Sequence, residues 1–155
     1  MNPSDFQLDR NDVLPKLIPE SDKYPIIAGL AGTVRDVAHL CGVESSHFYA
    51  MAGAMGRAVS IGLGLAMAQL EKRVLVCTGD GELLMNVGAL ATVAVMKPTN
   101  LCILCVDNEH YGETGNQRSH TGQCTDLAAM AHGARNPKVH TILKEEDIAD
   151  ATDLH

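Results

Sequence analysis

The sequence alternates short apolar runs with longer helical patterns, and this alternation limits the fold more than any other feature. The predicted strands are YPIIAGL (24–30), HFYAMA (47–52), RVLVCTG (73–79) and NLCILCVDN (100–108), and the predicted helices cover 33–41, 53–71, 82–96 and 125–132. Strands joined through helices run parallel, and near-continuous apolar strands are typical of a sheet covered on both faces. We therefore expect an α/β fold: a doubly wound parallel sheet with helices on both faces.

Length and composition support a single folded domain over residues 1–155. Of these 155 residues, 46% are hydrophobic and only 3% are aromatic, so the core must be built from aliphatic side chains. The tail after Pro137 turns acidic and contains no obvious closing strand. That pattern is compatible with a sheet that lacks its last strand.

The charge and the longest apolar run argue against two classes of partner. The net charge is −7 without a basic cluster, whereas nucleic acid requires a positive protein surface. The longest strongly apolar run, residues 58–70, is shorter than the roughly 20 residues that a membrane span needs. The first residues lack the charged-then-apolar pattern of a secretory signal. We expect a cytoplasmic protein that binds neither nucleic acid nor membrane.

The cysteines form an irregular set, at positions 41, 77, 102, 105 and 124. Cys102 and Cys105 make a C-x-x-C motif, which is found in zinc and redox sites. Both fall within a predicted strand, however, where a separation of three places side chains on opposite faces. We therefore interpret them as packing residues.

An acid between two glycines, Gly79-Asp80-Gly81, follows the third predicted strand. Helix 82–96 would return along the sheet for roughly 22 Å at about 1.5 Å per residue, and strand 100–106 would cover about the same distance at ~3.3 Å per residue. Asn108 should therefore emerge at the same edge as Asp80. Ligands of open parallel sheets bind at this carboxyl edge, and we expect Asp80 to face solvent there.

Asp80 and Asn108 together indicate a magnesium site. A carboxylate and an amide oxygen are hard ligands, and Mg²⁺ fills the rest of its shell with water and phosphate oxygens. The backbone amides of Gly81 and Glu82 open a helix and can donate to a phosphate. In the alternative interpretation, Asp80 is a helix N-cap and the two glycines are turn residues. Asn108 at the matching edge favours the cofactor.

Two blocks of the sequence resemble the thiamine diphosphate enzymes. GDGELLMNVGALATVAVMKPTNLCILCVDNEHYG is similar to the diphosphate-binding signature of that family, which opens in GDG and closes in an Asn after the next strand. FYAMAGAMGRAVSIGLGLAMAQLEKRVLVCTGDG extends the similarity upstream. The stretch DNEHYGETGNQRSHT is most similar to the beta subunit of sulfopyruvate decarboxylase and to phosphonopyruvate decarboxylase. The resemblance spans roughly residues 24–135 and implies the thiamine diphosphate-binding fold.

The resemblance implies a role for each matching residue. Mg²⁺ would be held by the side chains of Asp80 and Asn108 and by the backbone carbonyl of His110. The residues that would line thiamine diphosphate are Gly32, Thr33, Gly53, Met55, Gly79, Gly81, Glu82, Asn108 and Tyr111. Among these, the Gly53 carbonyl would accept the aminopyrimidine amino group, and Met55 would be the wedge beneath the thiazolium that bends the cofactor.

The resemblance also implies that the chain carries half of an active site. The family uses a glutamate from a pyrimidine-binding domain to help generate the reactive ylid, and residues 1–23 are too few for such a domain. An alpha-type partner subunit, or an N-terminal domain of a longer chain, would supply that glutamate within a hetero- or homo-oligomer. We therefore assign no catalytic residue to this chain. The implied activity is that of a carboxy-lyase, which releases CO2 from a 2-oxoacid of the sulfopyruvate or phosphonopyruvate type.

The loop after Asn108 carries Arg118 and His120, which we predict to contact the substrate. A guanidinium offers forked donors that suit sulfonate, phosphonate or carboxylate oxygens. The alternative is a solvated surface loop with an ordinary arginine.

Two other functions stay open at this point. One keeps the cofactor and changes the reaction to carboligation of the acetolactate synthase kind. The other is a non-catalytic nucleotide-binding α/β domain that uses the same edge. Against the second, GLAGTV lacks a G-x-G-x-x-G motif, and no G-x-x-x-x-G-K-[ST] motif occurs.

Overall fold

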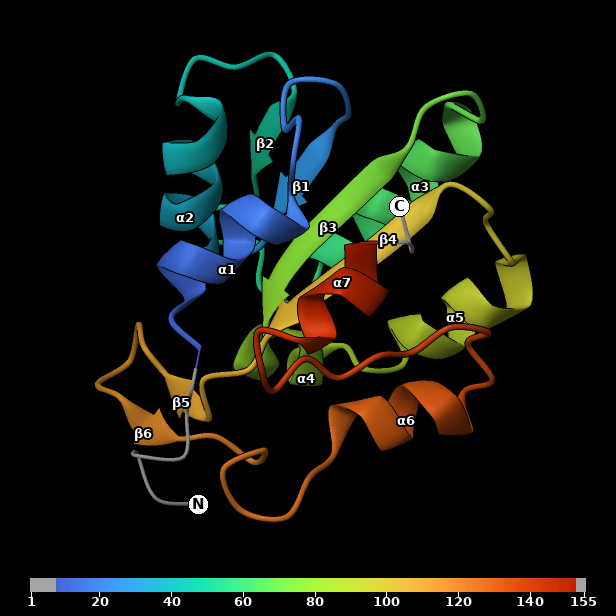
Figure 1. Ribbon diagram of the computed structural model, residues 1–155. Helices are drawn as coiled ribbons and strands as arrows, with labels where there is room; N and C mark the ends of the chain where they lie inside the picture. Colours follow the sequence, from blue (N-terminus) through green and yellow to red (C-terminus); the bar gives the residue numbers. More distant parts are fainter. Residues whose placement is uncertain (1–7, 153–155) are drawn as a thin grey trace.

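The computed structural model describes residues 8–152 and contains a parallel sheet of four strands (Figure 1). The strands are β1 (Ile26–Ala28), β2 (Phe48–Ala50), β3 (Val74–Gly79) and β4 (Leu101–Val106). They lie in the order β2-β1-β3-β4, and all three pairings are parallel. Each strand falls within one of the apolar runs, so the predicted α/β class and parallel sheet are confirmed.

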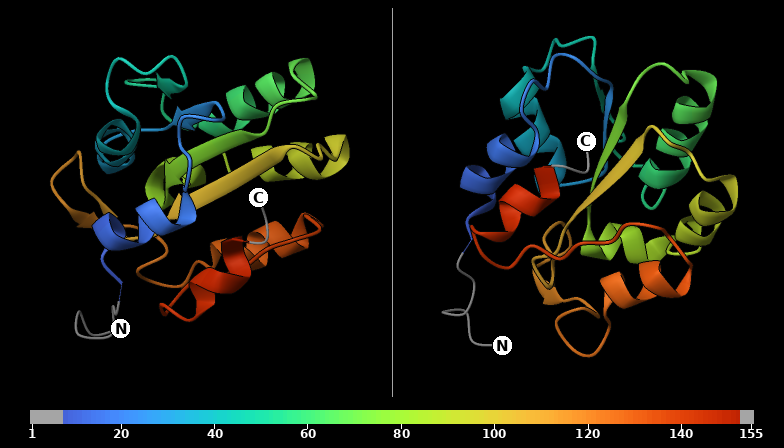
Figure 2. Two further views of the ribbon diagram at one scale, coloured as in Figure 1. Left: turned by 45° about the horizontal axis from the view of Figure 1, so that its top comes forward. Right: turned by 45° about the vertical axis from the view of Figure 1, so that its right-hand side comes forward.

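Helices cover both faces of the sheet (Figure 2). The helices on one face are α1 (Arg10–Leu17), α2 (Gly32–Cys41) and α7 (Asp147–Thr152), and those on the other are α3 (Ala58–Ala68), α5 (Ala89–Met96) and α6 (Leu127–Gly133). Neighbouring residues of β1 point to opposite faces of the sheet. Ile26 packs with the first group of helices and Ile27 with the second. The aliphatic residues thus form two cores that are separated by the sheet.

One predicted helix is divided in two. In place of a continuous helix over 82–96, α4 (Asp80–Met85) ends at Asn86 and α5 begins at Ala89. The Asn86 side chain donates from Nδ2 to the carbonyl of Gly56 at 3.0 Å. Asparagine favours helix ends because its side chain forms such bonds outside the helical pattern. This hydrogen bond connects the end of α4 to the loop that follows β2.

The two cysteines of the C-x-x-C motif pack on opposite sides of the sheet. Cys102 contacts the core beneath α1 and α2, and Cys105 contacts the core beneath α3 and α5. All five cysteines are free thiols. Within residues 8–152, no three His, Cys, Asp or Glu side chains gather in a way that could hold a metal ion. The interpretation of Cys102 and Cys105 as packing residues is confirmed.

The carboxyl edge of the sheet has a point at which the strand order reverses. From β1 the chain continues to β2 on one side, and from β3 it continues to β4 on the other. Ligands of open α/β sheets bind in the crevice at such a point. A hairpin of β5 (His110–Tyr111) and β6 (Gln117–Arg118) follows β4 at this edge, beside α4 in Figure 1. Among the described residues, no helix has the length and apolar character to cross a membrane.

The contact of α3 with the sheet depends on Gly62. A Cβ at position 62 would lie 2.2 Å from Cγ2 of Val76, whereas one at Gly64 would meet no atom within 4 Å. We predict that Gly62→Ala lowers the free energy of unfolding by roughly 1–3 kcal/mol through overpacking. Gly64→Ala, on the open face of the same helix, should raise it by roughly 0.5–1 kcal/mol. Denaturant titration measures both values, and equal effects would contradict this packing.

Candidate functional site

The GDG turn makes Asp80 the first residue of α4, directly beyond β3. Because Gly79 pairs with Val106, Asp80 and Asp107 leave neighbouring strands side by side, and Asn108 follows one residue later. Asp80 and Asn108 therefore share the carboxyl edge, as the sequence predicts. The expectation that Asp80 faces solvent is wrong: the residue is only 2% exposed.

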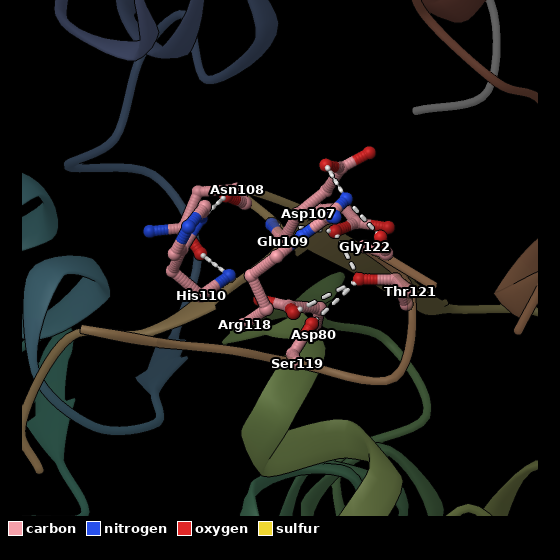
Figure 3. A network of polar contacts seen from close by, with 9 residues as sticks. All are labelled: Asp80, Asp107, Asn108, Glu109, His110, Arg118, Ser119, Thr121 and Gly122. Atoms are coloured by element: carbon pink, nitrogen blue, oxygen red, sulfur yellow. Dashed lines mark hydrogen bonds and ion pairs between the residues drawn. The ribbon is translucent and has the colours of Figure 1, made fainter. Parts of the chain in front are cut away.

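A threonine from the segment after β6 covers Asp80 (Figure 3). The Thr121 hydroxyl oxygen lies 3.1 Å from Oδ2 of Asp80, 2.7 Å from Oδ1 of Asp107 and 2.8 Å from the hydroxyl of Ser119. Ser119 is fully buried. Desolvation raises the pKa of Asp107, and the hydrogen bond from Thr121 opposes that rise. Two carboxylates thus converge on one neutral hydroxyl.

Asn108 and His110 form a local turn beside this network (Figure 3). The backbone amide of His110 donates to Oδ1 of Asn108 at 3.1 Å, and Nδ1 of His110 lies 2.9 Å from the carbonyl oxygen of Asn108. The three predicted metal ligands therefore gather at one edge. The amide oxygen of Asn108 is engaged by its own backbone turn.

The β5–β6 hairpin is fastened to the GDG turn by an aromatic ring. A Cβ on Gly81 would lie 2.5 Å from Cδ1 and from Cε1 of Tyr111. The ring can pack here because Gly81 has no side chain. The Tyr111 hydroxyl is 2.9 Å from Nδ1 of His120. Arg118 donates to the carbonyl of Gly122 and lies 3.6 Å from Oε2 of Glu109. Arg118 and His120, the two predicted substrate residues, are therefore both exposed and both bonded within the hairpin.

Gly32 and Thr33 are the first two residues of α2, which follows β1. No side chain caps the first turn of α2, and its N-cap residue, Ala31, has a φ of 60°. The Thr33 hydroxyl is buried and donates to the carbonyl of Leu30 at 2.8 Å, so its side chain is used locally. The guanidinium of Arg10 lies over Gly32, where a Cβ would be 2.3 Å from Nη1. This guanidinium is paired with a carboxylate, since Nε of Arg10 lies 3.4 Å from Oδ2 of Asp36.

The side chain of Glu82 lies inside the protein, between the ends of β1 and β3. Its Oε2 accepts a hydrogen bond from the Thr78 hydroxyl at 2.9 Å and fills the space that a Cβ on Gly29 would need. Its Oε1 is buried without a hydrogen-bond partner in the described part of the chain. Burial raises the pKa of Glu82, against the opposing effects of Thr78 and of the nearby backbone of Leu30 and Gly56. Only the backbone of Glu82 is left to line a phosphate.

Gly53 and Met55 lie in the loop between β2 and α3. Both are exposed, Met55 with 48% of its surface accessible. The loop rests on α4 through Gly56, where a Cβ would be 3.1 Å from Cβ of Met85. The residues that would contact the aminopyrimidine and thiazolium are therefore open to another molecule.

The donors at this edge suit a magnesium ion. Within residues 8–152, none of the ion pairs includes Asp80 or Asp107, so no cationic side chain neutralises these two carboxylates there. Oxygen ligands from one or two side chains, completed by water and phosphate, are the usual environment of Mg²⁺. The residues present therefore fit Mg²⁺ with a bound diphosphate. Sequence reasoning missed Asp107, although it stands next to Asn108, and it did not assign Thr121 or Ser119.

Comparison with known proteins identifies the family of this chain. Residues 31–152 match the family described as thiamine pyrophosphate enzyme, C-terminal TPP binding domain. The chain belongs to this family. Thiamine pyrophosphate is the same compound as thiamine diphosphate, so the resemblance identified from the sequence is confirmed.

The alignments with named relatives cover most of this chain. It is 39% identical to the sulfopyruvate decarboxylase subunit beta of Methanocaldococcus jannaschii, over 88% of this chain and 72% of that protein. It is 35% identical to the phosphonopyruvate decarboxylase of Streptomyces viridochromogenes, over 89% of this chain and 34% of that protein. The benzoylformate decarboxylase structure from Polynucleobacter necessarius aligns with 98% of this chain and 31% of its own, with a TM-score of 0.74 and 17% identity. That similarity supports the fold.

We predict that Glu82→Gln stabilises the protein at neutral pH. Because the folded-state pKa of Glu82 is raised, its carboxyl favours folding most below its ordinary pKa of 4.5 and loses that contribution as the pH rises through the folded value. A neutral amide avoids the loss, so the unfolding free energy should exceed that of the wild type by roughly 1 kcal/mol at pH 7.

Denaturant titration between pH 4 and pH 8 measures this difference, which should shrink toward pH 4. Glu82→Ala, which removes the side chain altogether, should be less stable than Glu82→Gln at every pH. A Glu82→Gln protein that is less stable than the wild type at pH 7 would contradict the burial argument.

Proposed function

We propose that this chain is the magnesium- and thiamine diphosphate-binding subunit of a 2-oxoacid decarboxylase. The observation that carries the proposal is Asp80: a carboxylate that is 2% exposed, placed at the first turn of a helix, with Asp107 and Asn108 beside it and without an ion-pair partner in the described residues. Such a charge is unfavourable unless a cation joins it. Mg²⁺ bound together with a diphosphate would supply that charge.

The chain's own residues bind and orient the cofactor. Asp80, Asn108 and the carbonyl of His110 would hold Mg²⁺, and the first amides of α4 would donate to the diphosphate. The missing side chain of Gly81 leaves room for the Tyr111 ring, which packs against this turn. When bound, thiamine diphosphate supplies the nucleophilic carbon and the electron sink of the reaction.

A partner would complete the site. Gly53 and Met55 lie exposed on this chain, as expected if the aminopyrimidine half of the cofactor is enclosed by another domain. The similarity to proteins named as beta subunits supports a separate alpha-type subunit that carries the pyrimidine-binding domain and the activating glutamate. The complex would then be a hetero-oligomer.

The substrate class follows from the relatives and from the hairpin. Relatives named for sulfopyruvate and phosphonopyruvate act on 2-oxoacids with a second anionic group. Arg118 and His120 lie on the exposed hairpin beside the metal residues, and the Arg118 guanidinium has donors beyond the one that reaches Gly122. We therefore propose 3-sulfopyruvate or 3-phosphonopyruvate as the substrate.

A product assay on the chain reconstituted with its partner tests the function and separates it from carboligation. Release of CO2 and an aldehyde from sulfopyruvate or phosphonopyruvate supports the decarboxylase. Condensation of two pyruvate molecules to acetolactate would instead support the carboligase, and turnover by this chain alone would remove the need for a partner.

We predict that Asp80→Asn abolishes magnesium-dependent binding of thiamine diphosphate and leaves the fold in place. The amide keeps the size of the side chain and can still accept a hydrogen bond from Thr121, but it lacks the charge that offsets a divalent cation. Isothermal calorimetry with and without Mg²⁺ measures the binding, and thermal melting checks the fold.

Glu113→Gln, which removes an exposed carboxylate from the neighbouring β5–β6 hairpin, is the control and should bind as the wild type does. Binding by Asp80→Asn that equals the wild type would rule out Asp80 as the metal ligand.

We predict that Arg118→Ala reduces kcat/KM for the dianionic substrate by roughly ten-fold, about 1.4 kcal/mol, and hardly changes it for pyruvate. The loss is that of one charge-assisted contact at an exposed site. Arg118→Lys keeps the charge but lacks the forked donors, so its kcat/KM for the dianionic substrate should lie between the values of the wild type and of Arg118→Ala. Arg73→Ala, directly before β3 at the opposite edge of the sheet, is the control. Equal losses on both substrates would remove Arg118 from substrate recognition.

A further inference from the structure

Three side-chain oxygens lie within hydrogen-bond distance of the Thr121 hydroxyl, which has only one hydrogen to donate. Its oxygen lies within hydrogen-bond distance of Asp80, Asp107 and Ser119, at 3.1, 2.7 and 2.8 Å (Figure 3). A hydroxyl carries one hydrogen and can accept from further donors. Ser119 can therefore donate to Thr121, while Asp80 and Asp107 compete for the single Thr121 hydrogen.

The Asp80 carboxylate has two distinct oxygens, and Thr121 engages one of them. The hydrogen bond uses Oδ2. This leaves Oδ1 available to a cation. Hydrogen bonds to the other oxygen of a ligating carboxylate orient the ligand and tune the metal site.

Thr121 also belongs to a segment that is tied to the edge on both sides. The amide of Ser119 donates to the carbonyl of Glu109 at 2.7 Å, and Arg118 donates to the carbonyl of Gly122. The amides of Gln123 and Cys124 both donate to the carbonyl of His120, each at 3.1 Å. An ordered turn, residues 119–124, therefore holds Thr121 beside the two carboxylates.

We propose that Thr121 is a positioning residue of the magnesium site, which orients Asp80 for the cation and links the order of residues 119–124 to occupancy of the site. The inference rests on the proposed function. A cation on Asp80 lowers the repulsion between the two carboxylates, so that both can stay against the Thr121 hydroxyl and hold the segment at the edge. In the chain, the segment lies between the metal residues and α6.

The test compares two substitutions at Thr121. Thr121→Val keeps the shape and removes the hydroxyl, and Thr121→Ser restores the hydroxyl. We expect Thr121→Val to weaken magnesium-dependent thiamine diphosphate binding by about ten-fold or more in calorimetry. Hydrogen exchange should show that Mg²⁺ and the cofactor slow the amides of residues 119–124 in the wild type and in Thr121→Ser, but not in Thr121→Val.

A threonine of the β5–β6 hairpin, Thr114, provides the control. The Thr114 hydroxyl donates to Gln117 at 2.9 Å, away from both carboxylates. Thr114→Val therefore removes a hydrogen bond from the hairpin without touching the metal residues and should leave binding and exchange unchanged. Thermal melting of each variant separates a loss of fold from a loss of positioning.

The outcomes distinguish the inference from the function on which it rests. If the wild type binds the cofactor with Mg²⁺ and Thr121→Val binds equally well, the inference is overturned and the proposed function stands. Weakening in Thr114→Val as large as in Thr121→Val, or no rescue by Thr121→Ser, also overturns it. If the wild-type chain itself shows no magnesium-dependent binding, the proposed function fails and the inference fails with it.

Discussion

The register between β3 and β4 is the constraint on which the site depends. Six residue pairs, from Val74 with Leu101 to Gly79 with Val106, bring the two strands to an end at the same level. Asp80 and Asp107 therefore emerge together, and Thr121 can reach both. A slip of one residue would turn every side chain of the strand to the other face, with Cys102 and Cys105 exchanging cores. The cores on the two faces thus hold the site in register.

The acids at this edge reduce stability in a way that a ligand can offset. Asp80 and Glu82 are 2% and 7% exposed, and no ion pair in residues 8–152 includes either. Desolvating a charge without a partner is unfavourable. For Asp80 the proposed compensation is a magnesium ion at the carboxyl edge. For Glu82 it is the hydroxyl of Thr78 and the space left by Gly29, which join the ends of β1 and β3.

The sequence predicted most of the sheet and the shared edge of Asp80 and Asn108, because apolar runs and helix lengths determine where strands end. Interactions between distant residues were harder to foresee. The break at Asn86 depends on a bond to Gly56, thirty residues away. The helix α1 contains Pro15, and α7 is short and acidic, so neither shows a clear helical pattern. The burial of Asp80 depends on Thr121, forty-one residues later in the chain. The inward turn of Glu82 depends on the missing side chain of Gly29.

The most direct measurement is a crystal structure of the chain with thiamine diphosphate and Mn²⁺, in which anomalous scattering locates the metal. The account predicts one strong peak within coordination distance of the Asp80 carboxylate, the Asn108 amide oxygen and the His110 carbonyl, with the diphosphate against the first turn of α4. A metal peak elsewhere, or a cofactor bound away from the carboxyl edge of β3 and β4, would contradict it.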